Sequence, residues 1–365
     1  MAARALSTSA AALGGAGGGT RRVAALRTPE SAFSAVPDYP FAPRYFESAT
    51  WRHDDDRSRP LRFHYLDEGP RDAAETVVLL HGEPSWSFLY RHMIPPLVAK
   101  GYRCVAPDLI GFGKSDKPTD DGLYTFAQHL EWLDEVLGGI SPALQGTTVV
   151  LQDWGGILGL RLLAADVESG GGRFARAVVA NTTLTTGDAP GALPGTSDVS
   201  EGFYAWKEWV HTGKLAGPVA IGDMLSRATG SAAKMPDAVK RAYDCPFPTD
   251  EYKAGVRRFP ELVPTPSTDG TGRPQAAEAA ENAAAWRTLA ASTPSLVPML
   301  CAFSDEDPIL GGCFKTFLEH VPGTKGQEHV TIGPGIGHFL QDKGGDQLAA
   351  VVAKFIASNP RGGKL

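Results

Sequence analysis

Strand-like and helix-like patterns of hydrophobic residues alternate along most of the chain. Short apolar or β-branched runs predict strands over residues 61–66, 76–80, 102–106, 149–151, 175–180, 296–303 and 329–332. Apolar residues three or four positions apart predict helices over residues 91–99, 126–137, 158–163, 314–320 and 348–356. Alternating strands and helices are typical of the α/β class, in which helices cover both faces of a mostly parallel central sheet.

This alternation stops between residues 184 and 287. The segment is rich in Pro, Gly, Trp and Tyr and contains only short helical patterns. An insertion at this point of an α/β fold would lie over the carboxyl ends of the strands, where such folds bind their ligands. We therefore expect a main domain formed by residues 28–183 and 288–365, with residues 184–287 as an inserted helical cap.

The first 27 residues have a different composition from the rest of the chain. They are rich in Ala, Gly, Ser and Thr, contain four arginines and have no acidic residue. Such a composition is found in organellar transit peptides and also in disordered tails. We expect residues 1–27 to be an extension outside the fold. The expected location is cytoplasmic, or organellar if the extension is a targeting segment.

The overall composition excludes several classes of protein. A chain of 365 residues that is 42% hydrophobic and 21% charged is typical of a soluble globular protein, and its net charge of −6 argues against a nucleic-acid partner or an anionic membrane surface. No apolar run approaches the roughly 18 residues of a membrane helix. The four cysteines are scattered, which favours core thiols over disulfides. Because no Cys-x-x-Cys or His-Glu-x-x-His motif is present, we expect no metal and no cofactor.

The segment Leu151-Gln-Asp-Trp-Gly155 is the strongest chemical signal in the sequence. It follows an apolar strand, and Gly155 and Gly156 permit a tight turn into the next helix. This is the arrangement of a nucleophile elbow, whose usual pattern is Gly-x-Ser-x-Gly. Asp153 replaces the serine. A carboxylate there can displace a leaving group from a saturated carbon and form an ester, although an aspartate after a strand can also be a simple helix N-cap.

A histidine and an acid follow the elbow in the order that such folds require. His338 lies in the glycine-rich segment 335–339, between the last predicted strand and the last helix. Asp305 and Asp307 both follow the predicted strand 296–303. One of them would orient the imidazole, and the other would be a solvated turn residue. We favour Asp307 because Pro308 fixes the loop beside it.

The remaining part of the predicted site is an oxyanion hole. His81-Gly-Glu-Pro84 follows a strand and precedes a helix, which is the location of one oxyanion-hole amide in these folds. We expect the backbone N–H groups of Glu83 and Trp154 to face the oxyanion that forms when water attacks the ester.

Four segments of the chain together resemble the haloalkane dehalogenases. They are residues 81–91 (HGEPSWSFLYR), 108–118 (DLIGFGKSDKP), 152–156 (QDWGG) and 337–341 (GHFLQ). The resemblance extends from about Leu26 to the final helix, and within the family it is to the branch that takes a halide-binding tryptophan from the cap. It implies an α/β-hydrolase fold and the hydrolysis of haloalkanes to alcohol and halide through an aspartyl-alkyl ester.

The resemblance also implies roles for particular residues. Asp153 would be the nucleophile, Asp307 the acid and His338 the base. Trp154 and Trp206 would bind the halide, since an indole N–H donates a hydrogen bond and accepts none. The only partners expected are a small haloalkane and a halide ion, and we expect a monomer. The substrate pocket would be lined by Ile157, Phe203, Phe259, Pro260, Ile309 and Leu310.

The sequence departs from that branch of the family where the pocket is expected. Ile157 and a glycine-rich stretch near Gly195 occupy positions where the resemblance leads one to expect phenylalanines. A wider cavity follows, and with it less preference for the smallest dihaloalkanes.

Two alternative functions stay open at this point. An epoxide hydrolase uses the same three residues and adds two cap tyrosines, for which Tyr204, Tyr243 and Tyr252 are candidates. A non-catalytic α/β-hydrolase-like protein would instead bind a small apolar ligand. Trp206 and Gln152 favour dehalogenation over epoxide hydrolysis, and the complete set of nucleophile, acid and histidine argues against a non-catalytic protein.

Overall fold

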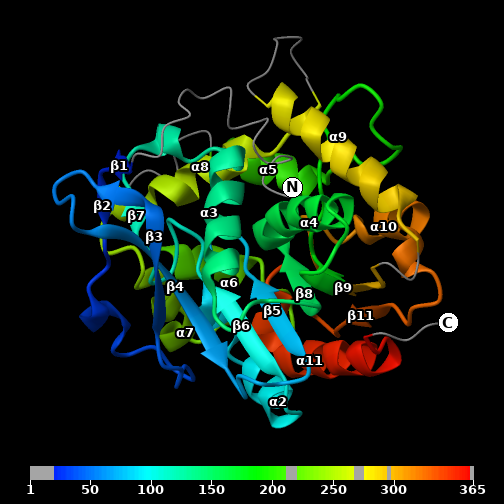
Figure 1. Ribbon diagram of the computed structural model, residues 1–365, viewed down its shortest axis with the longest axis horizontal. Coiled ribbons are helices and arrows are strands. Elements are labelled where there is room, and N and C mark those ends of the chain that lie inside the picture. The colour runs from blue at the N-terminus through cyan, green and yellow to red at the C-terminus, as the bar shows by residue number, and fades with distance from the viewer. Residues whose placement is uncertain (1–19, 211–219, 267–274, 294–296, 362–365) are drawn as a thin grey trace.

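A nine-stranded sheet forms the centre of the computed structural model, which describes residues 20–210, 220–266, 275–293 and 297–361. The strands lie in the order β1-β3-β4-β6-β5-β8-β9-β10-β11 (Figure 1). The six strands from β6 to β11 in this order are parallel, whereas β4 runs antiparallel to both of its neighbours. The strands are β1 (Arg21–Val23), β3 (Arg44–His53), β4 (Pro60–Glu68), β5 (Thr76–Leu80), β6 (Arg103–Pro107), β8 (Thr147–Gln152), β9 (Phe174–Ala180), β10 (Met299–Ser304) and β11 (Val330–Ile332).

Helices cover both faces of the sheet. Successive residues of a strand point to opposite faces, and in β8 this places Val150 in one hydrophobic core and Val149 and Leu151 in the other. The core around Val150 includes α2 and α11, which lie side by side in Figure 1, and the other core includes α3, α4, α9 and α10. The bounds of these helices are α2 (Ile94–Ala99), α3 (Phe126–Gly139), α4 (Asp153–Glu168), α9 (Ala276–Ala291), α10 (Phe314–His320) and α11 (Leu340–Ser358).

Among the described residues, four further α-helices stand between β9 and α9 in the chain. With the segments that follow β5, β8, β10 and β11, three of them enclose a cavity at the carboxyl ends of the strands. The four helices are α5 (Glu201–Trp209), α6 (Ile221–Arg227), α7 (Asp237–Asp244) and α8 (Ala254–Leu262). Short 3-10 helices are η2 (Glu30–Phe33), η3 (Ser87–Tyr90), η4 (Asp121–Leu123), η6 (Asp250–Lys253) and η7 (Pro322–Thr324). The expected α/β-hydrolase architecture is confirmed.

Two predicted elements begin three residues later than expected. The helix predicted from residue 91 begins at Ile94, because Pro95 and Pro96 suit the first positions of a helix and a 3-10 turn precedes them. The strand predicted from residue 296 begins at Met299, and residue 296 itself lies outside the described residues.

The sequence pattern missed strand β3 altogether. Only three of its ten residues, Ser48, Trp51 and His53, are buried, and arginine, glutamate and serine interrupt its apolar positions. It lies near the edge of the sheet, where one partner is the three-residue strand β1 and the other is β4. A strand so polar and so close to an edge carries a weak alternating signal.

Residues 20–27 belong to the fold. Residues 21–23 form β1, which pairs with β3, and β2 (Ala25–Leu26) pairs with β7 (Lys117–Pro118) in a small second sheet. Arg27 also binds the buried Asp116 with two hydrogen bonds of 2.7 and 2.8 Å. The prediction that residues 1–27 lie outside the fold is therefore wrong for residues 20–27, while residues 1–19 lie outside the described part.

The predicted end of the cap falls inside a helix. Helix α9 runs without a break across residues 287 and 288, and it packs against α4 of the main layer. Its Trp286 contacts the ring of Phe317 in α10 with a centroid distance of 5.0 Å. We propose that α9 belongs to the main domain and that the cap ends before it, so that residues 184–275 form the insertion.

Candidate active site

The turn from β8 into α4 holds Asp153 in an unusual backbone conformation. Its φ angle is +47°, in the left-handed region that non-glycine residues rarely adopt. A Cβ atom at Gly155 would lie 2.1 Å from the carbonyl oxygen of Leu80, and one at Gly82 would lie 2.3 Å from the Asp153 side chain. Both glycines are thus required for the chain segments to approach this closely. The predicted elbow geometry is confirmed.

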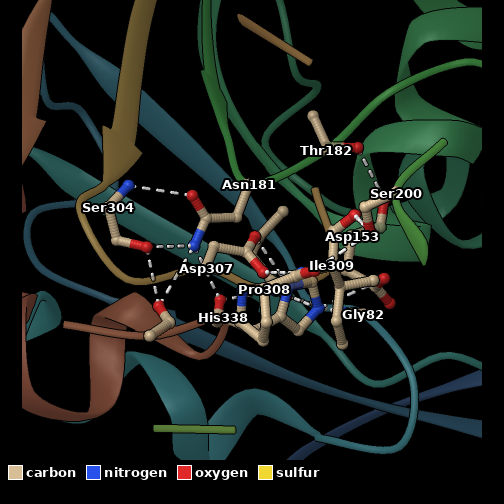
Figure 2. Close-up of polar contacts among 12 residues, drawn as sticks. Gly82, Asp153, Asn181, Thr182, Ser200, Ser304, Asp307, Pro308, Ile309 and His338 are labelled. Atoms are coloured by element: carbon tan, nitrogen blue, oxygen red, sulfur yellow. Dashed lines mark hydrogen bonds and ion pairs between the residues drawn. The ribbon is translucent and has the colours of Figure 1, made fainter. Parts of the chain in front are cut away.

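His338 lies between two carboxylates. Its Nε2 atom is 3.4 Å from Oδ2 of Asp153, and its Nδ1 atom is 3.0 Å from Oδ2 of Asp307 (Figure 2). The other oxygen of Asp307 accepts a hydrogen bond of 2.8 Å from the N–H of Ile309. Asp305 points elsewhere and accepts from the N–H groups of residues 335 and 336. The structure therefore brings Asp307, rather than Asp305, to the imidazole.

The electrostatics of the site follow from this arrangement. Burial lowers the pKa of His338, but the charge of Asp307 and the hydrogen bonds to both carboxylates outweigh burial and raise that pKa to about 10. Burial raises the pKa of Asp307, but the charge of His338, its hydrogen bond and backbone N–H groups reverse this effect and lower the pKa below its usual value. The ligand-free site consequently favours an imidazolium between two carboxylates.

The segment after β5 supplies a donor to the nucleophile candidate. The N–H of Glu83 donates to Oδ1 of Asp153 at 2.8 Å, and the N–H of Gly82 donates to the Gln152 side chain at 3.2 Å. Trp154 begins the first turn of α4, where N–H groups have no partner within the helix. Burial, followed by the nearby charge of Asp153, raises the pKa of the Glu83 carboxyl well above its ordinary value. Burial thus favours the neutral form of the Glu83 carboxyl.

A cavity of about 710 Å³ opens onto Asp153 and His338. Five of the six predicted pocket residues line it, namely Ile157, Phe203, Pro260, Ile309 and Leu310. The prediction for Phe259 is wrong: this residue is fully buried behind Trp154, with a ring centroid distance of 4.4 Å. Neighbouring residues of a helix point about 100° apart, so Pro260 faces the cavity while Phe259 faces the core.

Both predicted halide-binding tryptophans line the cavity. Trp154 is buried at its base, and Trp206 comes from α5, where its ring stacks on Trp209 with a centroid distance of 5.4 Å. Neither Trp154 nor Trp206 donates an indole hydrogen bond to another residue in the described ranges. Both rings thus form part of the cavity wall.

The cap tyrosines do not line the cavity. Tyr243 is fully buried, and its hydroxyl donates to Asp342 in α11 at 3.1 Å. Tyr204 lies on the surface of α5 with 38% of its area exposed, and Tyr252 packs against the core as a partly buried residue. No tyrosine of the described residues contributes to the cavity wall. An epoxide hydrolase would need two such hydroxyl groups there.

The comparisons with known proteins agree with the geometry. A family model for the alpha/beta hydrolase fold matches residues 75–219. The chain is 43% identical to a haloalkane dehalogenase from Psychrobacter cryohalolentis, over 92% of this chain and 99% of that protein. It is 40% identical to a haloalkane dehalogenase from Mycobacterium marinum, over 89% of this chain and 97% of that protein. The chain belongs to the haloalkane dehalogenase family. It is thus a hydrolase that acts on carbon–halogen bonds.

A solved structure of the same family gives a similar result. A tetrameric haloalkane dehalogenase from Paraglaciecola agarilytica superposes with a TM-score of 0.73 and 32% sequence identity, covering 92% of this chain and 99% of that one. Hydrolytic dehalogenation is therefore favoured over the two alternatives that the sequence left open.

Sequence reasoning missed the residues that hold the dehalogenase histidine in place. Asn181 has a φ angle of +44°, and its side chain donates to the carbonyl of His338 at 3.0 Å and accepts from the N–H of Ser304 at 2.9 Å (Figure 2). Gln152 also donates to that carbonyl, at 3.4 Å. A polar residue directly after a buried strand was the available signal, since Asn181 follows β9 at the edge where the site lies.

Within the described ranges, no cluster of three or more His, Cys, Asp or Glu could hold a metal ion, and no helix is long and apolar enough to cross a membrane. The four cysteines are free. Burial raises the pKa of Cys301 to about 12, which keeps it a thiol, as expected for a core cysteine.

Proposed function

We propose that Asp153, His338 and Asp307 hydrolyse haloalkanes in two steps, with Asp153 as the nucleophile. The observation that carries this proposal is the position of the Asp153 carboxylate, which faces the cavity 3.4 Å from His338 Nε2 and 2.8 Å from the N–H of Glu83. In the first step a carboxylate oxygen attacks the carbon that bears the halogen. The carbon–halogen bond breaks, halide leaves with the electron pair, and an alkyl ester of Asp153 remains.

The departing halide needs hydrogen-bond donors because the cavity is mostly apolar. The indole N–H groups of Trp154 and Trp206 would supply them, one from the base of the cavity and one from the cap. A donor placed where negative charge develops stabilises the transition state more than the ground state. In this proposal the cap contributes directly to carbon–halogen cleavage.

Ester formation prepares the histidine for the second step. Once Asp153 is an ester its negative charge is gone, and one of the influences that raises the pKa of His338 is lost. The neutral imidazole takes a proton from water, and the resulting hydroxide adds to the ester carbonyl. The N–H groups of Glu83 and Trp154 stabilise the oxyanion. On collapse the imidazolium returns its proton to the departing alkoxide, which leaves as the alcohol, and the remaining proton of the Asp153 carboxyl passes through His338 to solvent.

Asp307 would orient the imidazole and stabilise its cation. It is buried and accepts from His338 Nδ1 and from the N–H of Ile309, so its carboxylate is fixed on both sides. This leaves Nε2 of His338 directed toward Asp153, as general-base catalysis on the ester requires.

The cavity suits substrates larger than the smallest dihaloalkanes. A volume of about 710 Å³ is within the range of sites for drug-sized ligands, and Ile157 in its wall is smaller than a phenylalanine. We expect kcat/KM to rise along a series of 1-bromoalkanes from two carbons to about six, because each buried CH₂ group adds about 0.8 kcal/mol of favourable transfer free energy. A maximum at two carbons would contradict this expectation.

His338→Gln tests the two-step mechanism. The variant should release about one halide per site and then stop, because the ester forms without the base and is not hydrolysed. Mass spectrometry should find the alkyl group on the peptide that contains Asp153. Steady turnover without an adduct would contradict the proposed role of His338, and no halide burst at all would contradict nucleophilic attack by Asp153.

The assembly and the location of the protein stay predictions. We propose a monomer in the cytoplasm, or in an organelle if residues 1–19 act as a targeting segment. The Paraglaciecola agarilytica relative is tetrameric, so light scattering after size-exclusion chromatography distinguishes the two states.

A further inference from the structure

Every backbone N–H and C=O group of Gly335–His338, here called the histidine loop, has a hydrogen-bond partner. The first two N–H groups of the loop donate to the two carboxylate oxygens of Asp305, each at 2.9 Å. Its second carbonyl accepts from the N–H of Glu306 at 2.9 Å. Its last two carbonyls accept from the Asn181 side chain at 3.2 and 3.0 Å, and the third also accepts from the Ser304 hydroxyl at 2.8 Å.

The three remaining groups of the loop are bound by the cap. Residues Ala228–Ala232, here called the cap strap, follow α6 directly in the chain. The first two carbonyls of the strap accept from the N–H of His338 at 2.7 Å and from that of Gly337 at 3.0 Å. The last N–H of the strap donates to the carbonyl of Gly335 at 2.9 Å. The backbone that carries the catalytic imidazole is thus paired with the insertion.

The two segments approach too closely for side chains. A Cβ atom at Gly230, whose φ angle is +81°, would lie 2.4 Å from the carbonyl oxygen of Gly335. A Cβ atom at Gly337 would lie 2.3 Å from the carbonyl oxygen of Ala228. Since real Cβ contacts are not this short, glycine on both sides is a requirement of the pairing and not an accident of the sequence.

A side chain of residues 305–307, here called the acid loop, binds the strap from the other side. Glu306, which directly precedes Asp307, accepts from the N–H of Ser231 and from its hydroxyl, both at 2.7 Å. One carboxylate with two donors from a single residue defines the position of that residue well. The strap therefore contacts the loops of both the histidine and the acid.

We propose that the cap strap is a positioning element for His338 and that it couples the cavity wall to ester hydrolysis. Helix α6, which ends where the strap begins, contributes Met224 and Arg227 to the wall of the cavity. A substrate that packs against α6 therefore contacts an element that continues into the backbone partner of His338. This proposal rests on the role of His338 given above. Because only the second step uses the imidazole, the strap should matter for that step alone.

Variants of the Glu306–Ser231 contact test the proposal. Glu306→Gln and Ser231→Ala should each lower kcat about three- to tenfold, as expected for the loss of one or two hydrogen bonds that fix a catalytic group. In rapid-mixing experiments the rate of the first halide burst should be unchanged, and the alkyl-enzyme should accumulate during turnover. Ser231→Thr keeps both donors and should keep kcat. A destabilised fold, by contrast, would slow both steps or reduce the number of active sites.

A glycine pair supplies a larger perturbation with a matched control. Gly230→Ala inserts a Cβ into the strap–loop contact and should slow ester hydrolysis about a hundredfold, the cost of displacing a catalytic group by about 1 Å. Gly312→Ala adds the same methyl group at an exposed position with nothing within 4 Å, and should change neither step. If Gly230→Ala does not fold, the Glu306 and Ser231 variants still decide the question.

The outcomes separate this proposal from the proposed function. If His338→Gln traps the ester but the strap variants hydrolyse it at the parental rate, the strap proposal is wrong and the mechanism stands. If the strap variants slow the halide burst as much as they slow hydrolysis, the strap serves the whole site and the proposal is also wrong. If His338→Gln leaves no ester, the mechanism itself fails.

Discussion

The two ends of the candidate active site are built in different ways. Asp153 is held by its own neighbours in the chain: the strand before it, the helix after it and the glycine of the turn. Distant segments add a few contacts: the N–H of Glu83 donates to its carboxylate at 2.8 Å, Asn181 accepts from its backbone N–H at 3.0 Å, and the Thr182 hydroxyl donates to its backbone carbonyl at 2.8 Å. His338 is held instead by backbone and side-chain groups from β8, β9, the acid loop and the cap.

This difference separates the two chemical steps. In the proposed mechanism, halide displacement depends on the locally encoded elbow and on two indole donors. Ester hydrolysis depends on a histidine whose position is the sum of contacts far apart in sequence. A locally encoded structure such as the elbow tolerates changes elsewhere in the molecule. A side chain positioned by many distant contacts, such as His338, is sensitive to the loss of any of those contacts. Substitutions at the two ends should therefore stop the reaction at different points.

The largest effect is expected at the elbow. Asp153→Asn should lower steady-state halide release by a factor on the order of 10⁴ or more, because an amide displaces halide poorly and the site then loses both steps. Halide release is measured with an ion-selective electrode, and thermal unfolding checks that the fold is intact. Mass spectrometry must exclude deamidation of residue 153. Parental turnover by a protein that still carries asparagine would show that the nucleophile lies elsewhere.

At the other end, Asp307→Asn should stop the reaction after the first step. The variant loses the main influence that raises the pKa of His338 and the acceptor that orients its ring. Hydrolysis of the ester should fall by about 10³- to 10⁴-fold, as for the aspartate of other triads, while one equivalent of halide is still released. Asp305→Asn is the comparison: Asp305 is exposed and binds the backbone of the histidine loop rather than the imidazole, so its effect on ester hydrolysis should be much smaller.

The Asp307→Asn variant also tests the pKa of His338. In the free enzyme the pKa of His338 is raised to about 10, so the ring is protonated at neutral pH and loses its proton only as the pH approaches 10. Removing the Asp307 charge should lower that pKa, which NMR of the imidazole nitrogens can follow. In the alkyl-enzyme of the parental protein, Asp153 is an ester and carries no charge. The pKa of His338 should therefore be lower than in the free enzyme, and the low-pH limb of the pH–rate profile for ester hydrolysis should lie below pH 10. An acid limb at the pKa of the free enzyme would contradict this account.

The contrast between the two ends also explains what the sequence could reveal. The β8–α4 elbow was predictable because its strand, glycines and helix are contiguous, and the order of nucleophile, acid and histidine is fixed by the fold. The strap was not predictable, because no sequence pattern in Ala228–Ala232 indicates that its carbonyls bind residues more than 100 positions away. Strand β3 and residues 20–27 were missed for a related reason: polar edge strands owe their structure to their partners.

The choice between Asp305 and Asp307 illustrates what the sequence alone could not decide. Both residues follow β10 within three positions of its end, and the sequence offered only Pro308 as a reason to prefer one. In the structure both are used: Asp307 binds the imidazole and Asp305 binds the backbone of the loop that carries it. The expectation that the second aspartate is merely a solvated turn residue is therefore corrected.

A moderate effect is expected for Trp206, the cap residue that we propose acts in the first step. Trp206→Phe keeps an aromatic ring but removes one indole N–H, so it should weaken halide binding by about 1.5–3 kcal/mol, the range for a hydrogen bond to a charged group. Halide titration of the tryptophan fluorescence and the rate of the halide burst both report it. Trp209→Phe is the control, because Trp209 stacks on Trp206 and also lines the cavity. Equal effects of the two substitutions would argue against a specific role of Trp206.

The smallest effect on activity is expected at a contact that joins the cap to α11. The Tyr243 hydroxyl donates to Oδ1 of Asp342 at 3.1 Å, and the same oxygen accepts from Arg91 at 2.7 Å. Tyr243→Phe leaves the Arg91–Asp342 pair in place, so the free energy of unfolding should fall by about 1–2 kcal/mol while turnover changes little. Urea unfolding and steady-state kinetics measure the two quantities. Because this tyrosine lies outside the cavity, loss of activity with unchanged stability would reopen the epoxide hydrolase alternative, in which a cap tyrosine donates a proton to the substrate.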